Sequence, residues 1–147
     1  MGHAASELRA EVAAALPRLR AITDLRAGES RGDGKWVRKE ILGHLIDSAA
    51  NNQQRFVRAR FADPFTWPGY DQNAWVAAHG YRARAWAELV DLWAGFNAQV
   101  AAAMESVSSD RLGTSCAIGS DPPATLEWWM HDYVRHMRHH LAQIFES

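Results

Sequence analysis

The stretch LEWWMHDYVRHMRHHLAQIF, residues 126–145, carries the clearest helical pattern in the chain. Its apolar side chains recur at spacings of three and four, which is the period of one helical face. These residues are Leu126, Met130, Tyr133, Val134, Met137, Leu141 and Ile144. Thr125 is the expected N-cap, and Glu127 in the first turn complements the helix dipole. We therefore predict a helix over 126–145 that buries one face.

Three further stretches share this period. The first helix is predicted over residues 6–25, with a kink or a loosened turn at Pro17. The other two are predicted over 36–61 and 84–106. Long helices with short connections are typical of an antiparallel four-helix bundle. We predict this all-α fold, in a single domain over 1–147.

The segments between the helices are rich in residues that break regular structure. Residues 27–35, 63–71 and 108–123 contain several glycines or prolines and are predicted to be loops. A short helical piece is expected over 72–78. The loop at 63–71 is also unusually aromatic, and its residue Trp67 is a candidate to cover a binding site.

Composition narrows the class of protein. The chain has 147 residues, and sixteen Lys and Arg against seventeen Asp and Glu give a net charge of -1. This length suits one globular domain, and the near-neutral charge argues against a nucleic-acid-binding protein. No apolar run reaches the roughly 20 residues of a membrane helix, and the start of the chain lacks the pattern of a signal peptide. We therefore expect a cytoplasmic protein without a membrane partner.

Cys116 is the single cysteine of the chain, which excludes an internal disulfide and a zinc site built from several cysteines. It lies several residues before the predicted helix at 126–145, so no helix N-terminus activates its thiol. We interpret Cys116 as an ordinary thiol.

The chain has seven histidines, and four of them lie between residues 131 and 140. Because a helix turns about 100° per residue, His136 and His140 lie one turn apart on a flank of the apolar stripe. His131 and His139 point toward solvent. The spacing of His136 and His140 lets two imidazoles share one metal ion. The alternative interpretation is two buried rings that must find hydrogen bonds.

A third metal ligand has to come from another helix. His44 is the candidate, because it falls three residues after Ile41 and next to Leu45 on the inward face of its helix. Taken alone, His44 also fits a core histidine whose ring is hydrogen-bonded. His79 is a weaker alternative near the end of the short helical piece.

Polar side chains continue along the helix from His44. Ser48, Asn51 and Arg55 follow it at spacings of four, three and four on a core-facing side. One interpretation is a buried hydrogen-bond network that fixes helix register. The other is the polar wall of a pocket beside the metal, in which Arg55 pairs with an anionic group.

Two carboxylates, Glu40 and Asp47, lie at the edge of this polar row. Either is a candidate acceptor for the second ring nitrogen of a metal-binding histidine. Either is also a candidate general base.

Two segments resemble the signatures of the DinB-like superfamily. GKWVRKEILGHLIDSAANNQQRF, residues 34–56, is similar to the second-helix signature, in which a Trp opens the helix and a Glu stands four residues before the first metal histidine. DYVRHMRHHLAQI, residues 132–144, is similar to the last-helix signature, a His-x-x-x-His pair followed by a small residue and Gln-Ile. Leu141 and Ala142 stand where the family often has Arg-Gly.

The resemblance implies a four-helix bundle of the DinB-like type, often a homodimer, with a divalent metal held by three histidines. In this chain the matching positions are His44, His136 and His140. Relatives include S-transferases that use bacillithiol, mycothiol or glutathione, and a mycothiol-dependent maleylpyruvate isomerase. Three imidazoles suit zinc, nickel, copper or iron, and we expect zinc or nickel.

Three hypotheses for the function follow. The first is a metal-dependent enzyme that activates a low-molecular-weight thiol for S-transfer, with Asn51 and Arg55 orienting an anionic cosubstrate and Trp67 covering the site. The second is a hydrolase that uses metal-bound water, with Glu40 or Asp47 as the base. The third is a non-catalytic protein that binds a metal or a small ligand.

Overall fold

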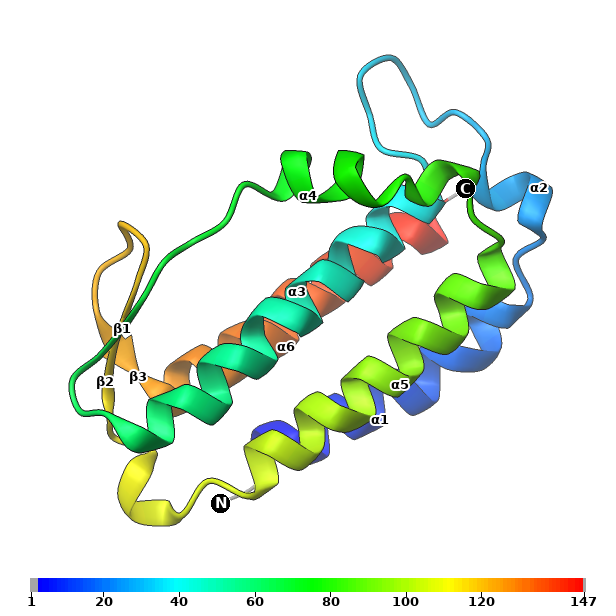
Figure 1. Cartoon of the computed structure of the whole chain (residues 1–147). Helices are drawn as coiled ribbons and strands as arrows, with labels where there is room; N and C mark the ends of the chain where they lie inside the picture. Colours follow the sequence, from blue (N-terminus) through cyan, green and yellow to red (C-terminus); the bar gives the residue numbers. More distant parts are fainter. Residues whose placement is uncertain (1–2, 147) are drawn as a thin grey trace.

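Four long helices form the body of the molecule in the computed structural model, which describes residues 3–146 (Figure 1). They are α1 (His3–Arg20), α3 (Arg38–Arg58), α5 (Trp86–Glu105) and α6 (Leu126–Phe145). Helix α5 packs against α1 and α3, and α6 packs against the same two helices. The predicted four-helix bundle is confirmed, and the helix predicted over 126–145 has the predicted bounds.

The directions of the helices differ from those of a simple antiparallel bundle. The starts of α3 and α5 meet at one end, where Asp24 binds Lys39 Nζ (3.1 Å) and the Trp86 backbone amide (2.8 Å). Their ends meet at the other end, where Arg60 donates to the Ser106 carbonyl. Helices α3 and α5 therefore run parallel, and each is antiparallel to α1 and α6. The connection between α3 and α5 returns along the length of the bundle (Figure 1).

This returning connection carries the short helix α4 (Gln72–His79), in agreement with the prediction for the segment. The Asp71 side chain caps its start, and Gly80 ends it in the left-handed conformation with φ 58°. Tyr81 follows, and its ring lies so close to Gly43 of α3 that a Cβ there would overlap it. The contact between Tyr81 and Gly43 seats the connection on α3.

The first helix is shorter than the predicted 6–25. Helix α1 ends at Arg20, and a separate short helix, α2 (Asp24–Ala27), follows it. Pro17 lies inside α1 and removes one backbone hydrogen bond near the end of the helix. The Thr23 side chain then caps the start of α2, because its hydroxyl accepts from a backbone amide of the new helix.

Two strands of a small sheet lie within segments predicted to be loops, so that prediction is wrong for these parts. The third strand follows directly after the second of these segments. Strand β1 (Phe65–Trp67) pairs in parallel with β2 (Ser115–Ile118), and β2 pairs antiparallel with β3 (Ala124–Thr125). Strands of two to four residues carry too little alternation to be recognised from sequence. The sheet lies at the end of the bundle where α3 ends and α6 begins (Figure 1).

The buried apolar side chains of the four long helices form one core. All seven residues of the stripe predicted on α6, from Leu126 to Ile144, are buried. Trp93 of α5 and Phe56 of α3 are fully buried as well. Among residues 3–146, no helix combines the length and the hydrophobicity that a membrane crossing requires.

Candidate metal centre

Three histidines meet between α3 and α6. His44 lies in α3, and His136 and His140 lie one turn apart in α6; together they are called the histidine triad. One ring nitrogen of each residue lies within 4.8 Å of the others. The ring centroids are 4.9 Å apart for His44 and His136, 4.7 Å for His44 and His140, and 4.6 Å for His136 and His140. The structure therefore brings together the three histidines that the sequence singles out.

The spacing of the ring nitrogens fits a metal ion. The Nε2 atoms of His44 and His136 are 3.1 Å apart. Two zinc–nitrogen bonds of about 2.0–2.1 Å at a tetrahedral angle place their nitrogens roughly 3.3 Å apart. The rings of His44 and His136 therefore need little movement to share an ion, and a donor set of three imidazoles suits zinc, nickel, copper or iron.

Burial keeps the rings of the triad uncharged. It lowers the pKa of His44 to about 3 and that of His136 to about 4, and it also lowers the pKa of His140. Neighbouring histidines lower all three pKa values further by charge repulsion. At neutral pH each ring is therefore neutral, which is the form that offers a lone pair to a metal.

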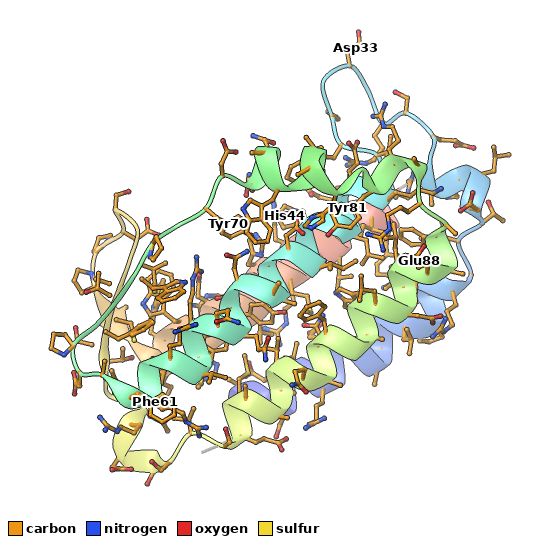
Figure 2. All side chains as sticks on the ribbon, in the orientation of Figure 1. Asp33, His44, Phe61, Tyr70, Tyr81 and Glu88 are labelled. Atoms are coloured by element: carbon orange, nitrogen blue, oxygen red, sulfur yellow. The ribbon has the colours of Figure 1, made fainter. Side chains whose placement is uncertain are left out.

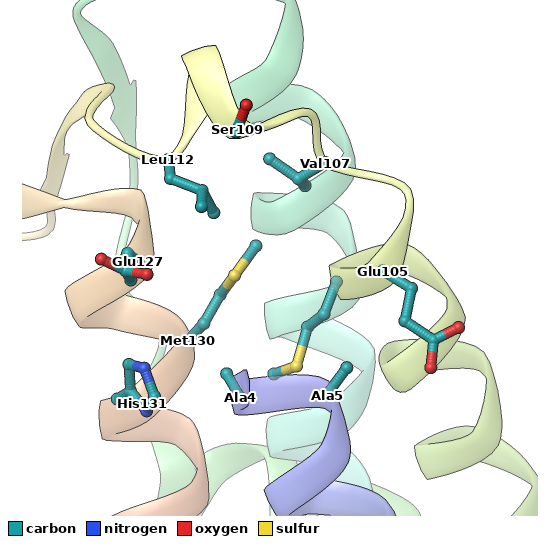
Figure 3. Close-up of a pocket in the computed structure, with 10 residues that line it drawn as sticks. Ala4, Ala5, Glu105, Val107, Ser109, Leu112, Glu127, Met130 and His131 are labelled. Carbon is teal, nitrogen blue, oxygen red and sulfur yellow. The ribbon is translucent and has the colours of Figure 1, made fainter. Parts of the chain in front are cut away.

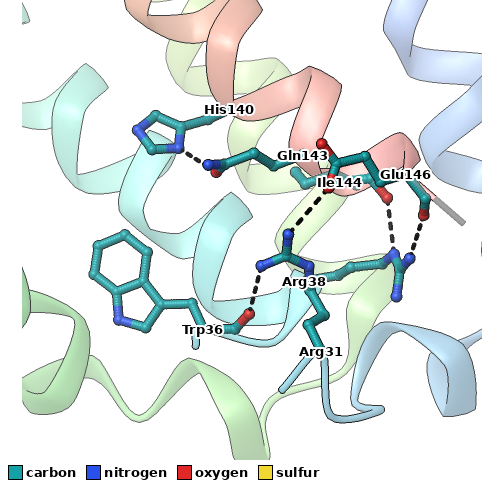
Figure 4. Close-up of polar contacts among 7 residues, drawn as sticks. All are labelled: Arg31, Trp36, Arg38, His140, Gln143, Ile144 and Glu146. Carbon is teal, nitrogen blue, oxygen red and sulfur yellow. Dashed lines mark hydrogen bonds and ion pairs between the residues drawn. The ribbon is translucent and has the colours of Figure 1, made fainter. Parts of the chain in front are cut away.

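Neighbouring side chains orient two of these rings. His140 Nδ1 lies 2.8 Å from Gln143 Oε1 (Figure 4), so the ring donates its Nδ1 proton and keeps the Nε2 lone pair for a metal. The Trp36 ring packs 5.0 Å from the ring of His44. The Nδ1 atom of His44 is buried and has no hydrogen-bond partner in the described part of the chain.

Glu40 and Asp47 are engaged elsewhere and do not bind a ring of the triad. The buried Asp47 accepts hydrogen bonds at Oδ1 from the Tyr81 hydroxyl (2.6 Å) and from His79 Nδ1 (2.9 Å). Glu40 accepts from the Val37 backbone amide (3.1 Å) and so caps the start of its own helix. No hydrogen bond joins either carboxylate to a ring of the triad in the described residues, because helix capping engages Glu40 and the seating of the α4 connection engages Oδ1 of Asp47.

The other histidines of α4 and α6 lie outside the triad. His79, the weaker candidate ligand, binds Asp47 instead. His131 lies 3.4 Å from the Glu7 carboxylate, and His139 is exposed. Helical phase separates the histidines of α6 as expected, but His131 is half-buried against Glu7 of α1 and does not face solvent freely.

A pocket of about 180 Å³ opens beside His44 and His136. Polar and aromatic side chains from α3, from α6, from the start of α4 and from the segment just before α4 form its wall. They are His44, Ser48, Asn52, Arg55, Tyr70, Gln72, Trp129, Asp132, Tyr133 and His136. Figure 2 shows Tyr70, His44 and Tyr81 along α3 on the side of α4.

Comparison with known proteins identifies the family. The family model of the DinB superfamily matches residues 7–144. The chain belongs to the DinB superfamily. No curated protein matches its sequence.

Solved structures share the fold of this DinB-superfamily chain. YfiT from Bacillus subtilis, described as a probable metal-dependent hydrolase with an unusual four-helix bundle topology, has a TM-score of 0.82 at 23% identity. That alignment covers 96% of this chain and 81% of YfiT. The mycothiol-dependent maleylpyruvate isomerase has a TM-score of 0.79 at 14% identity, over 97% of this chain. The chain spans only 59% of the isomerase.

Part of the polar row predicted on α3 lines the pocket of this DinB-superfamily protein. Ser48 and Arg55 stand in the wall, whereas Asn51 donates to the Asp47 backbone carbonyl (2.9 Å). Asn52, about 100° further round the helix, lines the pocket instead. The position of α6 decides which of the two asparagines faces the pocket.

Arg55 brings positive charge to the pocket. Its Nη1 donates to Asn52 Oδ1 over 3.4 Å, and its buried Nε has no hydrogen-bond partner in the described residues. The Tyr70 ring centroid lies 5.9 Å from its guanidinium carbon. Because a buried charge is costly unless it is paired, an anionic ligand in the pocket would stabilise Arg55.

Trp67 does not line the pocket that it was expected to cover. Its ring stacks 5.9 Å from that of Phe65 and lies 4.8 Å from the Arg58 guanidinium. The pairing of β1 with β2 holds Trp67 there. Tyr70, three residues later in the same aromatic segment, lines the pocket instead.

Asp132 is a carboxylate of the pocket wall that apolar periodicity does not single out. It lies four residues before His136, and therefore on the same face of α6. This spacing is the sequence signal by which Asp132 could be found. Its Oδ1 atom lies 3.5 Å from Arg135 Nη2, and both side chains are partly exposed.

Cys116 offers no nucleophile to the pocket. It is buried, and burial raises the pKa of its thiol to about 11. Its backbone carbonyl accepts a hydrogen bond from Trp129 Nε1 (3.1 Å). These features agree with the expectation of an ordinary thiol.

A smaller pocket, of about 70 Å³, lies at the end of the bundle where α1 begins and α5 ends (Figure 3). Its lining includes Met104, Met130 and His131 but no member of the triad. We therefore place the candidate site at the pocket beside the triad.

Proposed function

We propose that this chain is a metal-dependent enzyme in which His44, His136 and His140 hold a divalent ion that activates a low-molecular-weight thiol for S-transfer. The observation that carries the proposal is the convergence of three imidazoles, of which His44 is buried and His136 and His140 are half-buried, beside a polar pocket. Three protein ligands leave a coordination position for a cosubstrate, as in catalytic zinc sites. Zinc or nickel is the expected ion.

The residues of the site have distinct roles in this proposal. When bound, the ion supplies the Lewis acidity that lowers the pKa of a thiol. Gln143 orients the ring of His140, and Asp132 stands in the same wall to take up the thiol proton. The thiolate sulfur then bonds to an electrophilic carbon, and the leaving group departs with the electron pair of the bond that breaks.

Two features of the site favour an external thiol with an anionic group. Arg55 presents an incompletely paired guanidinium to the pocket, which suits a carboxylate of the cosubstrate. Cys116 is buried outside the pocket wall, so the sulfur has to come from a small molecule. The fold shared with a mycothiol-dependent isomerase also supports an external thiol as the cosubstrate.

Metal-assisted hydrolysis is a second candidate function. Asp132 favours it, because a carboxylate in the pocket wall can act as a general base toward water. Glu40 and Asp47 are bound elsewhere, so Asp132 replaces them in this role. The fold shared with YfiT, described as a probable metal-dependent hydrolase, supports this alternative.

Metal analysis and paired assays test both functions. The protein is reconstituted with zinc or nickel and assayed for thiol conjugation to a chlorodinitrobenzene and for hydrolysis of a nitrophenyl ester. S-transfer requires turnover that depends on metal and thiol and is lost in the His136→Ala/His140→Ala double variant. Ester turnover without thiol would instead support hydrolysis, and metal binding without turnover would support a binding protein. A wild-type protein that binds no metal would contradict both proposed enzyme functions, S-transfer and metal-assisted hydrolysis.

We also propose that the protein is a homodimer that acts on a small molecule in the cytoplasm. Trp75 and Trp128 are large apolar side chains with 36% and 46% of their surface exposed, and self-association would bury them. The single buried thiol of Cys116 suits a reducing compartment. Size exclusion with light scattering measures the mass, and the mass of one chain would contradict the dimer.

A further inference from the structure

The end of α6 is capped by a side chain from another helix. The last carbonyls of a helix have no partner within it, and α6 has no basic residue in its last turn. Arg38 of α3 supplies the missing donors. Its Nε donates to the Ile144 carbonyl (2.8 Å) and its Nη2 to the Glu146 carbonyl (2.5 Å) (Figure 4).

Burial makes this contact of Arg38 specific to one arrangement of the helices. Only 5% of Arg38 is exposed, and a buried cation is costly unless its charge is compensated. Both of its acceptors are carbonyls at the negative end of the α6 dipole. The guanidinium is therefore compensated only while the end of α6 stays at this position along α3.

Arg31 adds a second link at the same place. Its Nη1 donates to the Trp36 carbonyl (3.1 Å), and its Nη2 lies 3.5 Å from the Glu146 carboxylate (Figure 4). Trp36 is the residue whose ring packs against His44. The two arginines therefore join the start of α3 to the end of α6.

These links lie within two helical turns of the triad. Arg38 precedes His44 by six residues, which is about 9 Å along a helix, and Ile144 follows His140 by four, about 6 Å. A slip of one residue between the helices would move the ligands by about 1.5 Å. Metal–ligand distances hold only within about 0.2 Å, so such a slip would dismantle the site.

We infer that Arg38 is a positioning residue for the metal centre, which fixes the register of α6 against α3 so that the three imidazoles converge. The inference rests on the proposed function, because it assumes that the triad binds a metal. Arg60 provides a matched control. It donates to the carbonyl of Ser106 at the end of α5, a helix that carries no histidine of the triad.

Titration of the full-length protein with cobalt(II) tests the inference, because the visible absorption reports affinity and coordination geometry together. We expect Arg38→Met to raise the Kd for cobalt about 10- to 100-fold and to alter the visible band. Arg38→Lys should give an intermediate Kd, because a single ammonium group does not reproduce the two-donor fork. Arg60→Met should leave Kd and spectrum unchanged, even if it lowers thermal stability as much as Arg38→Met does.

Several outcomes would overturn the inference. The inference is overturned if Arg38→Met keeps the wild-type Kd and spectrum, a result that leaves the proposed metal centre intact. It is also overturned if Arg38→Met and Arg60→Met lose the same amount of cobalt affinity. If Arg38→Met does not fold, Arg38→Lys decides, and wild-type cobalt binding in that variant overturns the inference. A wild-type protein that binds no cobalt overturns the proposed function itself, and this inference with it.

Discussion

Burial lowers the pKa of His44 to about 3 and that of His136 to about 4, whereas an imidazole in an unfolded chain has a pKa of about 6.5. As the pH falls through 6.5, the unfolded chain therefore takes up protons. The native rings take them up only near pH 4 and below. Because the unfolded state binds more protons in this window, stability rises with pH across it.

We therefore expect the metal-free protein to lose stability as the pH falls from about 6.5 to about 4. The slope is at most about 1.4 kcal/mol per pH unit for each histidine of the triad. Urea unfolding followed by tryptophan fluorescence at a series of pH values measures it. The His136→Ala/His140→Ala double variant should show a shallower dependence, and an unchanged slope would contradict the assignment to the triad.

Arg55 is the residue expected to recognise the charge of a cosubstrate. Removing a hydrogen bond to a charged group costs about 1.5–3 kcal/mol, so Arg55→Met should weaken binding of glutathione about 10- to 100-fold. Calorimetric titration measures the affinity, and elemental analysis verifies that the metal stays bound. Arg58→Met is the control, because Arg58 is exposed and lies over Trp67. Equal affinities of wild type and Arg55→Met would remove Arg55 from the binding site.

At the scale of elements, different faces of α3 contact different neighbours. His44 and Arg55 face the pocket between α3 and α6. Gly43 and Asp47 face the connection that returns from the end of α3, where they meet Tyr81. This second face explains why Asp47 is unavailable to the triad, although it lies only three residues after His44.

Gly43→Ala tests how closely the connection is seated on α3. The new Cβ would overlap the Tyr81 ring, so we expect a loss of about 1–3 kcal/mol in the free energy of unfolding. Gly95→Ala in α5 is the matched control, because a Cβ there meets nothing within 4 Å. It should stabilise the protein by about 0.5–1 kcal/mol. If urea unfolding gave the same change for both variants, Tyr81 would not be seated on Gly43.

At the scale of the whole molecule, the triad joins helices that are far apart in the chain. His44 belongs to α3, while His136 and His140 belong to α6, which runs antiparallel beside it. The long return between α3 and α5 leaves this pair of helices in direct contact. A ligand that binds all three rings therefore stabilises the folded state, because the unfolded chain does not hold the rings together.

Metal binding should accordingly raise the melting temperature. At free metal one hundred times the Kd, the gain in the free energy of unfolding is about 2.7 kcal/mol. Differential scanning calorimetry with zinc or nickel measures the shift, which a chelator should reverse. The His136→Ala/His140→Ala double variant should melt at the same temperature with and without metal. A metal-dependent shift of wild-type size in this variant would contradict binding at the triad.

Local patterns in the sequence determined the long helices and two of the three histidines of the triad. The period of α6, its cap at Thr125 and the phase of His136 against His140 depend on residues that are close together in the chain. A helix of known period places such residues on its surface without reference to the rest of the molecule. The same reasoning placed His44 on an inward face, but it did not show what the ring faces.

Only the tertiary structure decided how these faces combine. It chose Asn52 over Asn51 and Tyr70 over Trp67 for the pocket wall, and it brought His44 Nε2 to 3.1 Å from His136 Nε2. It also set α3 parallel to α5. It paired three strands that are too short to show an alternating pattern in the sequence. The physical reason is that each of these features depends on the rotation and the axial position of one element against another distant in the chain. Hydrophobic periodicity records which face of an element is buried but does not record the partner of that face.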